Sequence, residues 1–231
     1  FYNKFQFQIN VIRQKEPALW KARNYGIKNA NSEYIFFLDD DSKITSDWLI
    51  EHLKSLDYFN ADISSGVSIS RVGAKVPENY SFFRLSDQMD TGNVLIKKQV
   101  FIKCGLFDLQ FEKMRMGDGE FGVRAYLNGF INISNPISYR EHLKLSTGGL
   151  RSMGHWDAFH TKNIFSMRPV PSVFYYWRKY WGSKAAIYLS LIRIPFTLLP
   201  YRYKSKHPSL LISCILSLLL SPVIIIQVFC S

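Results

Sequence analysis

Along the first two thirds of the chain, the pattern of hydrophobic and polar positions predicts strands that alternate with helices. Residues Tyr34–Leu38 are all apolar or aromatic, and the run is too short for an ordinary helix, so it predicts a buried strand. Less regular apolar runs predict further strands at 5–12, 61–70, 93–96, 130–133 and 137–139. Strands that alternate with helices indicate an α/β domain with a mostly parallel sheet.

The intervening segments predict helices. Pro17 suits the first position of one helix, and Ser46 is a suitable N-cap for the next, which runs through Leu56. On this second helix we expect the apolar side chains to face inward, namely Trp48, Leu49, Leu53 and Leu56. Two shorter helices are expected at 97–104 and 120–128, and each is followed by a glycine that can end it.

The last part of the chain has a different pattern. Residues 174–181 hold six aromatic rings and two cations, which is typical of a membrane–water interface, although an aromatic core patch has the same composition. Residues 208–231 carry no charge over 24 positions, and about 20 apolar residues suffice to cross a bilayer. Pro222 and several serines leave a second interpretation open, a hairpin that enters the membrane and returns.

Charge divides the chain at the same place. The 231 residues have a net charge of +11, yet no acid follows Asp157, whereas seven Lys or Arg residues lie from Pro169 onward. We therefore expect a globular domain over 1–168 and a segment, 169–231, that meets an anionic surface.

The basic residues also predict an orientation. Arg202, Lys204 and Lys206 precede the uncharged run, and the positive-inside tendency then places the domain on the cytoplasmic side of a membrane. Because the excess positive charge lies in an apolar tail and not on a polar face, we expect no nucleic-acid partner. The three widely spaced cysteines fit a reducing compartment.

Three acids, Asp39, Asp40 and Asp41, come directly after the strand Tyr34–Leu38. Open α/β sheets place ligand sites just beyond the carboxyl ends of their strands. In an extended chain Asp39 and Asp41 point to one side and Asp40 to the other. Two carboxylates on one side make an oxygen site for Mg²⁺ or Mn²⁺, usually shared with substrate phosphates. The alternative is a solvated acidic turn before the next helix.

Four further patterns stand in a fixed order around these acids. They are ARNYGI at 22–27, TGN at 91–93, GLFD at 105–108 and GDGEFGVR at 117–124. Together with the aspartates, this order and spacing resembles the family-two inverting glycosyltransferases of the GT-A fold, over about residues 9–145. The resemblance implies a GT-A-like, Rossmann-like α/β fold with a mixed, mostly parallel sheet flanked by helices. The tail adds C-terminal membrane-associated helices to this expectation.

The resemblance also implies a nucleotide-sugar donor and a divalent cofactor, Mn²⁺ or Mg²⁺. By matching position, it implies that the donor contacts Arg23, Asp39, Asp40 and Asn93, and that the metal is held by Asp39, Asp41 and His142. A guanidinium can bond two oxygens of a phosphate, which suits Arg23. The alternatives are a surface arginine at Arg23 and a surface or packing histidine at His142.

Asp118 matches the catalytic base of the family. A carboxylate within reach of an acceptor hydroxyl can take its proton as the oxygen attacks C1 of the donor sugar. Asp118 is also predicted to sit just before a helix, where aspartate is a common N-cap, and the two roles are compatible. Glu120 matches a second acid of the motif, which contacts the acceptor or braces Arg124. Gly117 stands where the family usually has an acid.

Two early strands that complete the nucleotide site in the family have no counterpart here, so we expect an N-terminally incomplete GT-A domain. The sequence predicts an inverting glycosyltransferase that moves a sugar from a nucleotide-sugar donor to a hydroxyl acceptor. The expected acceptor is a glycan or lipid-linked glycan at a membrane, in surface polysaccharide assembly. The competing prediction is a catalytically inactive, membrane-bound relative that acts as a binding or scaffold module.

Overall fold

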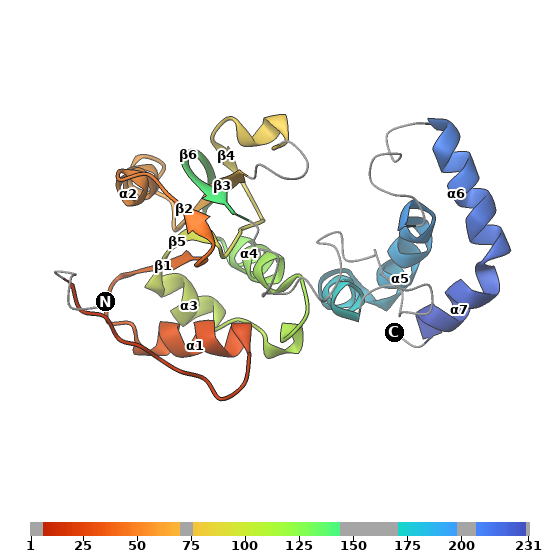
Figure 1. Cartoon of the computed structure of the whole chain (residues 1–231), viewed down its shortest axis with the longest axis horizontal. Coiled ribbons are helices and arrows are strands. Elements are labelled where there is room, and N and C mark those ends of the chain that lie inside the picture. Colours follow the sequence, from red (N-terminus) through yellow and green to blue (C-terminus); the bar gives the residue numbers. More distant parts are fainter. Residues whose placement is uncertain (1–6, 70–75, 144–170, 198–206, 230–231) are drawn as a thin grey trace.

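The computed structural model describes residues 7–69, 76–143, 171–197 and 207–229. An α/β domain comes first in the chain, and three helices follow it (Figure 1). The elements of the domain are α1 (Leu19–Asn29), β1 (Tyr34–Leu38), β2 (Ser42–Lys43), α2 (Trp48–Tyr58), β3 (Ile63–Ile69), η2 (Glu78–Tyr80), β4 (Arg84–Leu85), β5 (Asn93–Lys97), α3 (Lys98–Cys104), η3 (Leu109–Phe111), α4 (Gly117–Leu127) and β6 (Asn132–His142). The tail holds α5 (Pro171–Thr197), α6 (His207–Leu219) and α7 (Ser221–Phe229).

The sheet is mixed, with the strand order β1-β5-β3-β6-β2 and with β4 paired to β6. Among the described strands only β3 and β6 run parallel, and the other pairs are antiparallel. The prediction of a mostly parallel sheet is therefore wrong for this part of the chain. The physical reason is that β5 lies between β1 and β3 and runs against both of them.

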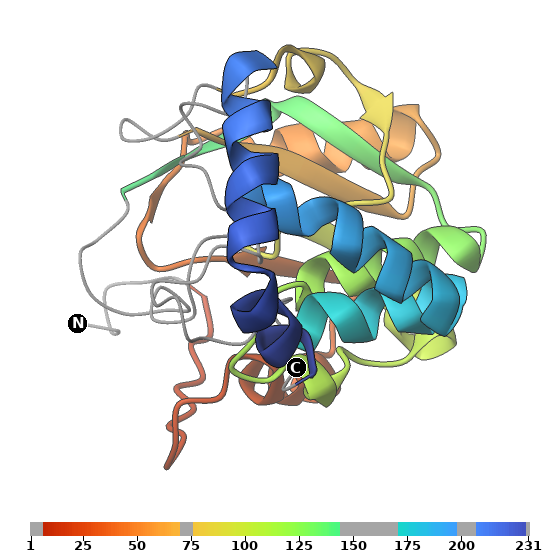
Figure 2. The same cartoon turned by 90° about the vertical axis from the view of Figure 1, so that its right-hand side faces the viewer.

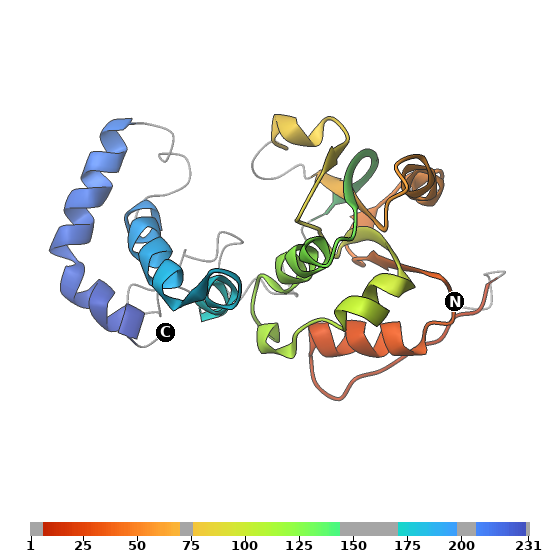
Figure 3. The same ribbon diagram turned by 180° about the vertical axis from the view of Figure 1, so that it is seen from behind.

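Alternating side chains of β1 and β5 build a core on each face of the sheet. On one face Ile35 and Val94 pack with residues of α1, α3 and α4, including the fully buried Phe121. On the other face Phe36 and Leu95 pack against α2. The helices thus cover both faces, as Figure 1 and the view from behind in Figure 3 show.

Helix α2 turns a partly polar side toward the sheet. Trp48 and Leu56 are buried as expected, but Leu49 and Leu53 are 45% and 40% exposed. His52 and Ser55 are buried in their place because the sheet provides hydrogen-bond partners for them. His52 Nδ1 lies 2.8 Å from Ser64 Oγ of β3, and Ser55 Oγ lies 2.8 Å from the same hydroxyl. The apolar pattern of this helix therefore predicted the wrong inner face at two positions.

Several element boundaries differ from prediction. Helix α1 begins at Leu19 and not at Pro17, and the N-cap of α2 is Asp47 and not Ser46. Residues 7–12 form no strand, and the rest of the strand predicted at 5–12 lies outside the described residues. Helix α4 begins at Gly117, so Asp118 lies in its first turn and not before it, and Met116 is the N-cap with φ 78°. The two short strands expected after α4 are one strand, β6, which ends at His142.

The tail divides at a glycine. Helix α5 is kinked at Gly182, whose φ of 80° is a left-handed conformation that glycine adopts readily. Before the kink, Val173 and Tyr176 are buried, and Tyr176 belongs to the main core of the domain. The aromatic segment predicted for a membrane interface thus supplies part of a protein core, although Trp181 remains half exposed.

After α5, helix α6 lies across the outer side of α5, and α7 continues from the end of α6 (Figure 2). The uncharged run is broken near Leu220 into helices of 13 and 9 residues. Within the described ranges, no helix has both the length and the apolar character needed to cross a bilayer. The predicted C-terminal membrane helices are therefore not confirmed. The predicted domain boundary at 168, and Arg202, Lys204 and Lys206, lie outside the described residues.

Candidate active site

Asp39, directly after β1, is held by two arginines. Its Oδ1 accepts from Nη2 of Arg23 on α1 at 3.2 Å, and its Oδ2 accepts from Nη1 of Arg140 on β6 at 3.0 Å. Gly92 makes this approach possible, since a Cβ there would lie 2.4 Å from Asp39 Oδ2 and 2.2 Å from Arg140 Nη2. The first aspartate of the triplet is thus fixed at the point where α1, β1 and β6 meet.

Arg140 and Asp90 are site residues that the sequence analysis missed. Arg140 is buried, and its Nη2 donates to Asp90 Oδ2 at 3.0 Å while its Nε donates to Ser68 Oγ at 2.8 Å. Burial raises the pKa of Asp90, but Arg140, Ser68 and the Gly92 amide lower it, and the net direction is downward. One sequence signal was present: Arg140 lies two residues before His142, so both share one side of a strand.

Asp118 completes a group that we call the sheet-edge cluster, defined as Arg23, Asp39, Asp90, Asp118 and Arg140. Asp118 is partly buried, and its Oδ1 accepts from the Gly119 amide at 2.9 Å. Burial, followed by the negative charge of Asp90, raises the pKa of Asp118 to about 6, against the smaller opposing effects of the Gly119 amide and Arg23. At neutral pH this carboxylate is ionised and remains a stronger proton acceptor than an ordinary aspartate.

Arg23 connects the two ends of the sheet-edge cluster. Burial lowers its pKa, and the charges of Asp39, Asp118 and Asp90, in that order, raise it. The guanidinium therefore lies within electrostatic reach of all three carboxylates. It also stacks on Trp20 of its own helix, with 5.1 Å between the guanidinium carbon and the ring centroid. Arg23 is consequently a partly buried residue of the site and not an ordinary surface arginine.

Asp41 and His142 meet as a pair, with Asp41 Oδ2 3.0 Å from His142 Nε2. Short strand β2 brings them together, because Ser42 pairs with His142 across the sheet. A carboxylate oxygen and an imidazole nitrogen are donors that suit Mn²⁺, so this pair fits a divalent ion. Both oxygens of Asp39 already contact guanidinium groups. In the described part of the chain, no group of three or more His, Cys, Asp or Glu forms a potential metal site.

Asn93 does not fit the predicted contact with the donor. It is fully buried. Its Oδ1 lies 3.0 Å from Trp48 Nε1 and 3.1 Å from His52 Nε2, and its Nδ2 donates to the carbonyls of Val67 and Ser138. Its amide is therefore used inside the protein, where it joins α2 to the sheet. The predicted donor contact of Asn93 is therefore wrong, because the side chain is buried, and the motif alone does not reveal burial.

Glu120 is likewise 0% exposed and does not fit an acceptor contact. Its carboxylate accepts two hydrogen bonds from Arg124, which agrees with the other predicted role of Glu120, that of bracing Arg124. Asp40, the other residue of the triplet that was predicted to contact the donor, is exposed.

Gly117, where the family usually has an acid, has a steric explanation. A Cβ at this position would lie 2.4 Å from the indole ring of Trp20. The ring is fixed there because Trp20 Nε1 donates to the Phe111 carbonyl at 2.8 Å. Trp20 thus fills the space that a side chain at position 117 would need.

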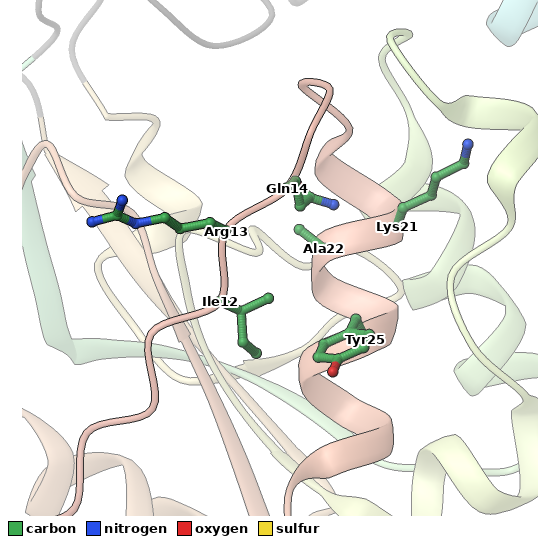
Figure 4. A pocket seen from close by; sticks show the side chains of 6 residues that line it. All are labelled: Ile12, Arg13, Gln14, Lys21, Ala22 and Tyr25. Atoms are coloured by element: carbon green, nitrogen blue, oxygen red, sulfur yellow. The ribbon is translucent and has the colours of Figure 1, made fainter.

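A separate hollow lies between the segment 12–14 and helix α1 (Figure 4). It is lined by Ile12, Arg13, Gln14, Lys21, Ala22 and Tyr25. None of the predicted site residues lines it, so it is distinct from the sheet-edge cluster.

The curated relative Glycosyltransferase GlyA of Streptococcus pneumoniae serotype 4 is 25% identical over 153 residues. The match covers 55% of this chain and 20% of that protein. The chain thus spans about a fifth of the length of this relative.

Solved structures show weaker likeness. TarS of S. aureus, residues 1–349 in complex with UDP-GlcNAc, has a TM-score of 0.49 at 17% identity, over 81% of this chain and 49% of that one. GalNAc-T7 with UDP, GalNAc and Mn²⁺ has a TM-score of 0.46 at 13% identity, over 54% of this chain and 30% of that one.

The model of glycosyl transferase family 2 matches residues 1–114, about half of the chain. The matched part contains α1, the aspartate triplet and β5, and the mixed sheet flanked by helices agrees with the expected GT-A-like α/β fold. The chain therefore belongs to glycosyl transferase family 2.

Proposed function

We propose that this protein transfers a sugar, with inversion, from a nucleotide-sugar donor to a hydroxyl acceptor. One observation carries the proposal. Arg23 bonds the donor-side carboxylate Asp39 and also lies within electrostatic reach of Asp118, whose raised pKa suits a base. The sheet-edge cluster thus places a guanidinium group that can contact a donor phosphate beside a poised proton acceptor.

Asp118 accepts the proton of the acceptor hydroxyl as its oxygen attacks C1 of the donor sugar. The bond from C1 to the diphosphate breaks on the opposite side, so a single displacement inverts the configuration. At neutral pH a carboxylate whose pKa is about 6 is ionised and ready for this step. Its partial burial makes it a better base than a fully solvated aspartate.

The donor lies, in this proposal, along the exposed side of the aspartate triplet. Arg23 and Asp39 orient it, with the exposed Asp40 beside them, and Asp41 with His142 would hold Mn²⁺ or Mg²⁺. A bound divalent ion neutralises part of the negative charge on the departing diphosphate. Arg140 keeps the Asp39 carboxylate oriented by holding it at 3.0 Å.

Calorimetry with uridine and guanosine diphosphates, with and without Mn²⁺, tests the donor site. We expect at least one nucleotide to bind in a Mn²⁺-dependent manner, and Asp41→Ala and His142→Ala to weaken that binding. Asp57→Ala, an exposed acid on α2, is the control and should bind as the wild type does. Absence of binding to any nucleotide, or unchanged Mn²⁺ dependence in both variants, would contradict the assignment. Binding without any turnover would favour the scaffold module.

For the acceptor, we extend the proposal to a glycan, or to a glycan linked to a lipid, at a membrane surface. Exposed apolar side chains gather on α6, on α7 and on α5 beyond its kink. They are Ile187, Leu191, Leu211, Ile215, Leu218, Leu219, Ile225 and Ile226. Because no acid follows Asp157, this surface suits anionic lipid, with the domain on the cytoplasmic side.

Flotation of the full chain with phosphatidylglycerol vesicles tests this surface. We expect the wild type to float and Leu218→Glu on α6 to lose flotation. Ile102→Glu, at an equally exposed apolar site on α3, should behave as the wild type does. If the wild type stays in the soluble fraction, the membrane assignment is wrong.

A further inference from the structure

The first half of α5 is joined to the domain by a group of polar contacts that the proposed chemistry does not use. We call this group the α4–α5 cluster, and it consists of Asp108, Glu120, Arg124, Tyr175, Lys179 and Tyr180. The first three lie on the domain and the last three on α5. Figures 1 and 3 both show the beginning of α5 beside α4.

Glu120 lies at the centre of the α4–α5 cluster. Its fully buried carboxylate accepts from Nε and Nη2 of Arg124 at 3.0 and 2.9 Å, from Lys179 Nζ at 2.9 Å and from Tyr180 Oη at 2.6 Å. Burial raises the pKa of Glu120, but these donors lower it and prevail. A buried carboxylate without such partners is strongly unfavourable. Helix α5 donates two of the four hydrogen bonds that hold the Glu120 carboxylate.

Lys179 connects two separate segments of the domain. Besides Glu120 on α4, its ammonium group contacts Asp108 Oδ2 at 2.8 Å, and Tyr175 donates to the same oxygen at 2.9 Å. Asp108 in turn caps the short helix η3 through the Gln110 amide. The side chain of Lys179 is 31% exposed, so these contacts lie at the edge of the core and are only partly screened by water.

The α4–α5 cluster also reaches the proposed base through the backbone of one helical turn. Glu120 follows Asp118 by two residues in the first turn of α4, and its amide donates to the Met116 carbonyl at 2.7 Å. The amide between them, that of Gly119, bonds the Asp118 carboxylate. Any displacement of Glu120 therefore moves the turn that carries Asp118.

We infer that Lys179 and Tyr180 are positioning residues of the transfer reaction, which fix, through Glu120, the place of the Asp118 carboxylate relative to the donor. This inference rests on the proposed function. It makes the tail a requirement for the chemistry, although no α5 residue belongs to the sheet-edge cluster. A misplacement of about 1 Å can reduce a rate by about a hundredfold, so a small movement of this turn is sufficient.

Lys179→Met is the principal test. We expect kcat to fall about tenfold while donor affinity is unchanged, because the proposed donor contacts lie on α1, directly after β1 and on β6. Lys179→Arg keeps the charge and should restore most of the rate. Arg178→Met removes a neighbouring, exposed cation from the same helix and should leave kcat unchanged. If Lys179→Met keeps the wild-type kcat, or loses donor affinity in proportion to kcat, the inference is wrong.

A titration of the Asp118 carboxyl by ¹³C NMR tests the inference without any substrate. The charged groups that act most on Asp118 are Asp90 before β5 and Arg23 on α1. Arg115 before α4 also lies within electrostatic reach of it, and none of the three lies on α5. Mere loss of a distant cation would raise the pKa of Asp118. A turn released toward water loses burial, so we expect its pKa in Lys179→Met to fall from about 6 toward the ordinary value.

The NMR result also separates failure of the inference from failure of the proposed function. A wild type without transfer activity, but with the expected fall of the pKa in Lys179→Met, would contradict only the proposed function. An unchanged or raised pKa in a folded Lys179→Met protein would overturn the inference. Should Lys179→Met not fold, Tyr180→Phe removes a single hydroxyl from Glu120 and must show the same fall.

Discussion

Two carboxylates in the first turn of α4, two residues apart, have opposite environments. Asp118 belongs to the sheet-edge cluster, where burial and Asp90 raise its pKa to about 6. Glu120 faces the α4–α5 cluster, where Arg124, Tyr180 and Lys179 outweigh the effect of burial and lower its pKa. Neighbouring acids on one helix are thus separated into a proton acceptor and a fixed anion by what each one contacts. The sequence motif does not distinguish these roles.

The largest effect on activity is expected for Asp118, the proton acceptor of this comparison. Asp118→Asn should reduce kcat by about a thousandfold, because a neutral amide cannot take the acceptor proton. Nucleotide binding should persist, since Arg23, Asp39 and the Asp41–His142 pair are intact. Transfer assays and calorimetry on the same sample measure both quantities. Near-normal transfer by Asp118→Asn would show that the base lies elsewhere, and Asp57→Asn on α2 is the matched control.

The next effect is on stability, and it concerns the fixed anion. Glu120→Gln leaves the charges of Arg124 and Lys179 without their buried partner, so the free energy of unfolding should fall by about 3 kcal/mol. Glu51→Gln, which breaks a surface pair with Lys54, should cost less than about 1 kcal/mol. Urea denaturation of both variants measures the difference. Equal losses would mean that the α4–α5 cluster is no stronger than a surface ion pair.

A smaller effect, of opposite sign, is expected for Asp118. Its folded pKa is raised, so its contribution to stability is fully present below the unfolded value and is lost as the pH rises through about 6. Asp118→Asn should therefore raise the free energy of unfolding at neutral pH, by on the order of 1 kcal/mol. Glu120, with a lowered pKa, loses its contribution as the pH falls. Denaturation at acidic and neutral pH checks these signs, and a less stable Asp118→Asn at neutral pH would contradict them.

The smallest expected effect concerns the neighbour that raises the pKa of Asp118. Transfer should increase with pH through about 6 in the wild type, as Asp118 ionises. Asp90→Asn removes a negative charge, so the rise should move to lower pH. The pH dependence of kcat/KM measures this position even where the absolute rate has changed. Asp87→Asn, an exposed acid in the same loop, should leave the rise where it is, and an unmoved rise in Asp90→Asn would exclude this coupling.

The sequence was sufficient for what depends on local pattern. The apolar run before Asp39 is β1, and Gly105, with φ 82°, ends α3 as expected. The resemblance implied that Asp41 and His142 share a metal site, and the two side chains do lie together although 101 residues separate them; the metal role stays a prediction. Residues whose role depends on distant partners were not found. Arg140 bonds Asp39 and Asp90 from another strand, and its spacing of two residues from His142 does not identify these partners.

Buried polar residues explain most of the remaining errors. His52 reads as a polar surface position on α2, yet it is fully buried between Ser64 and Asn93. Its pKa is lowered by burial to about 4, so it is neutral near physiological pH and can remain in the core. The aromatic segment of α5 was predicted to lie at a membrane interface, but its composition also fits a protein core. The structure shows a protein core there, because Tyr176 is buried in the core of the domain and Tyr175, Trp177 and Tyr180 pack against it.

A single ¹³C carboxyl titration of the wild-type chain, which follows Asp118 and Glu120 together, tests the central claim most directly. The account predicts that Asp118 titrates near pH 6 and that Glu120 titrates below the ordinary glutamate value. Asp118 titrating at or below the ordinary aspartate value, with Glu120 at or above its own, would contradict the account.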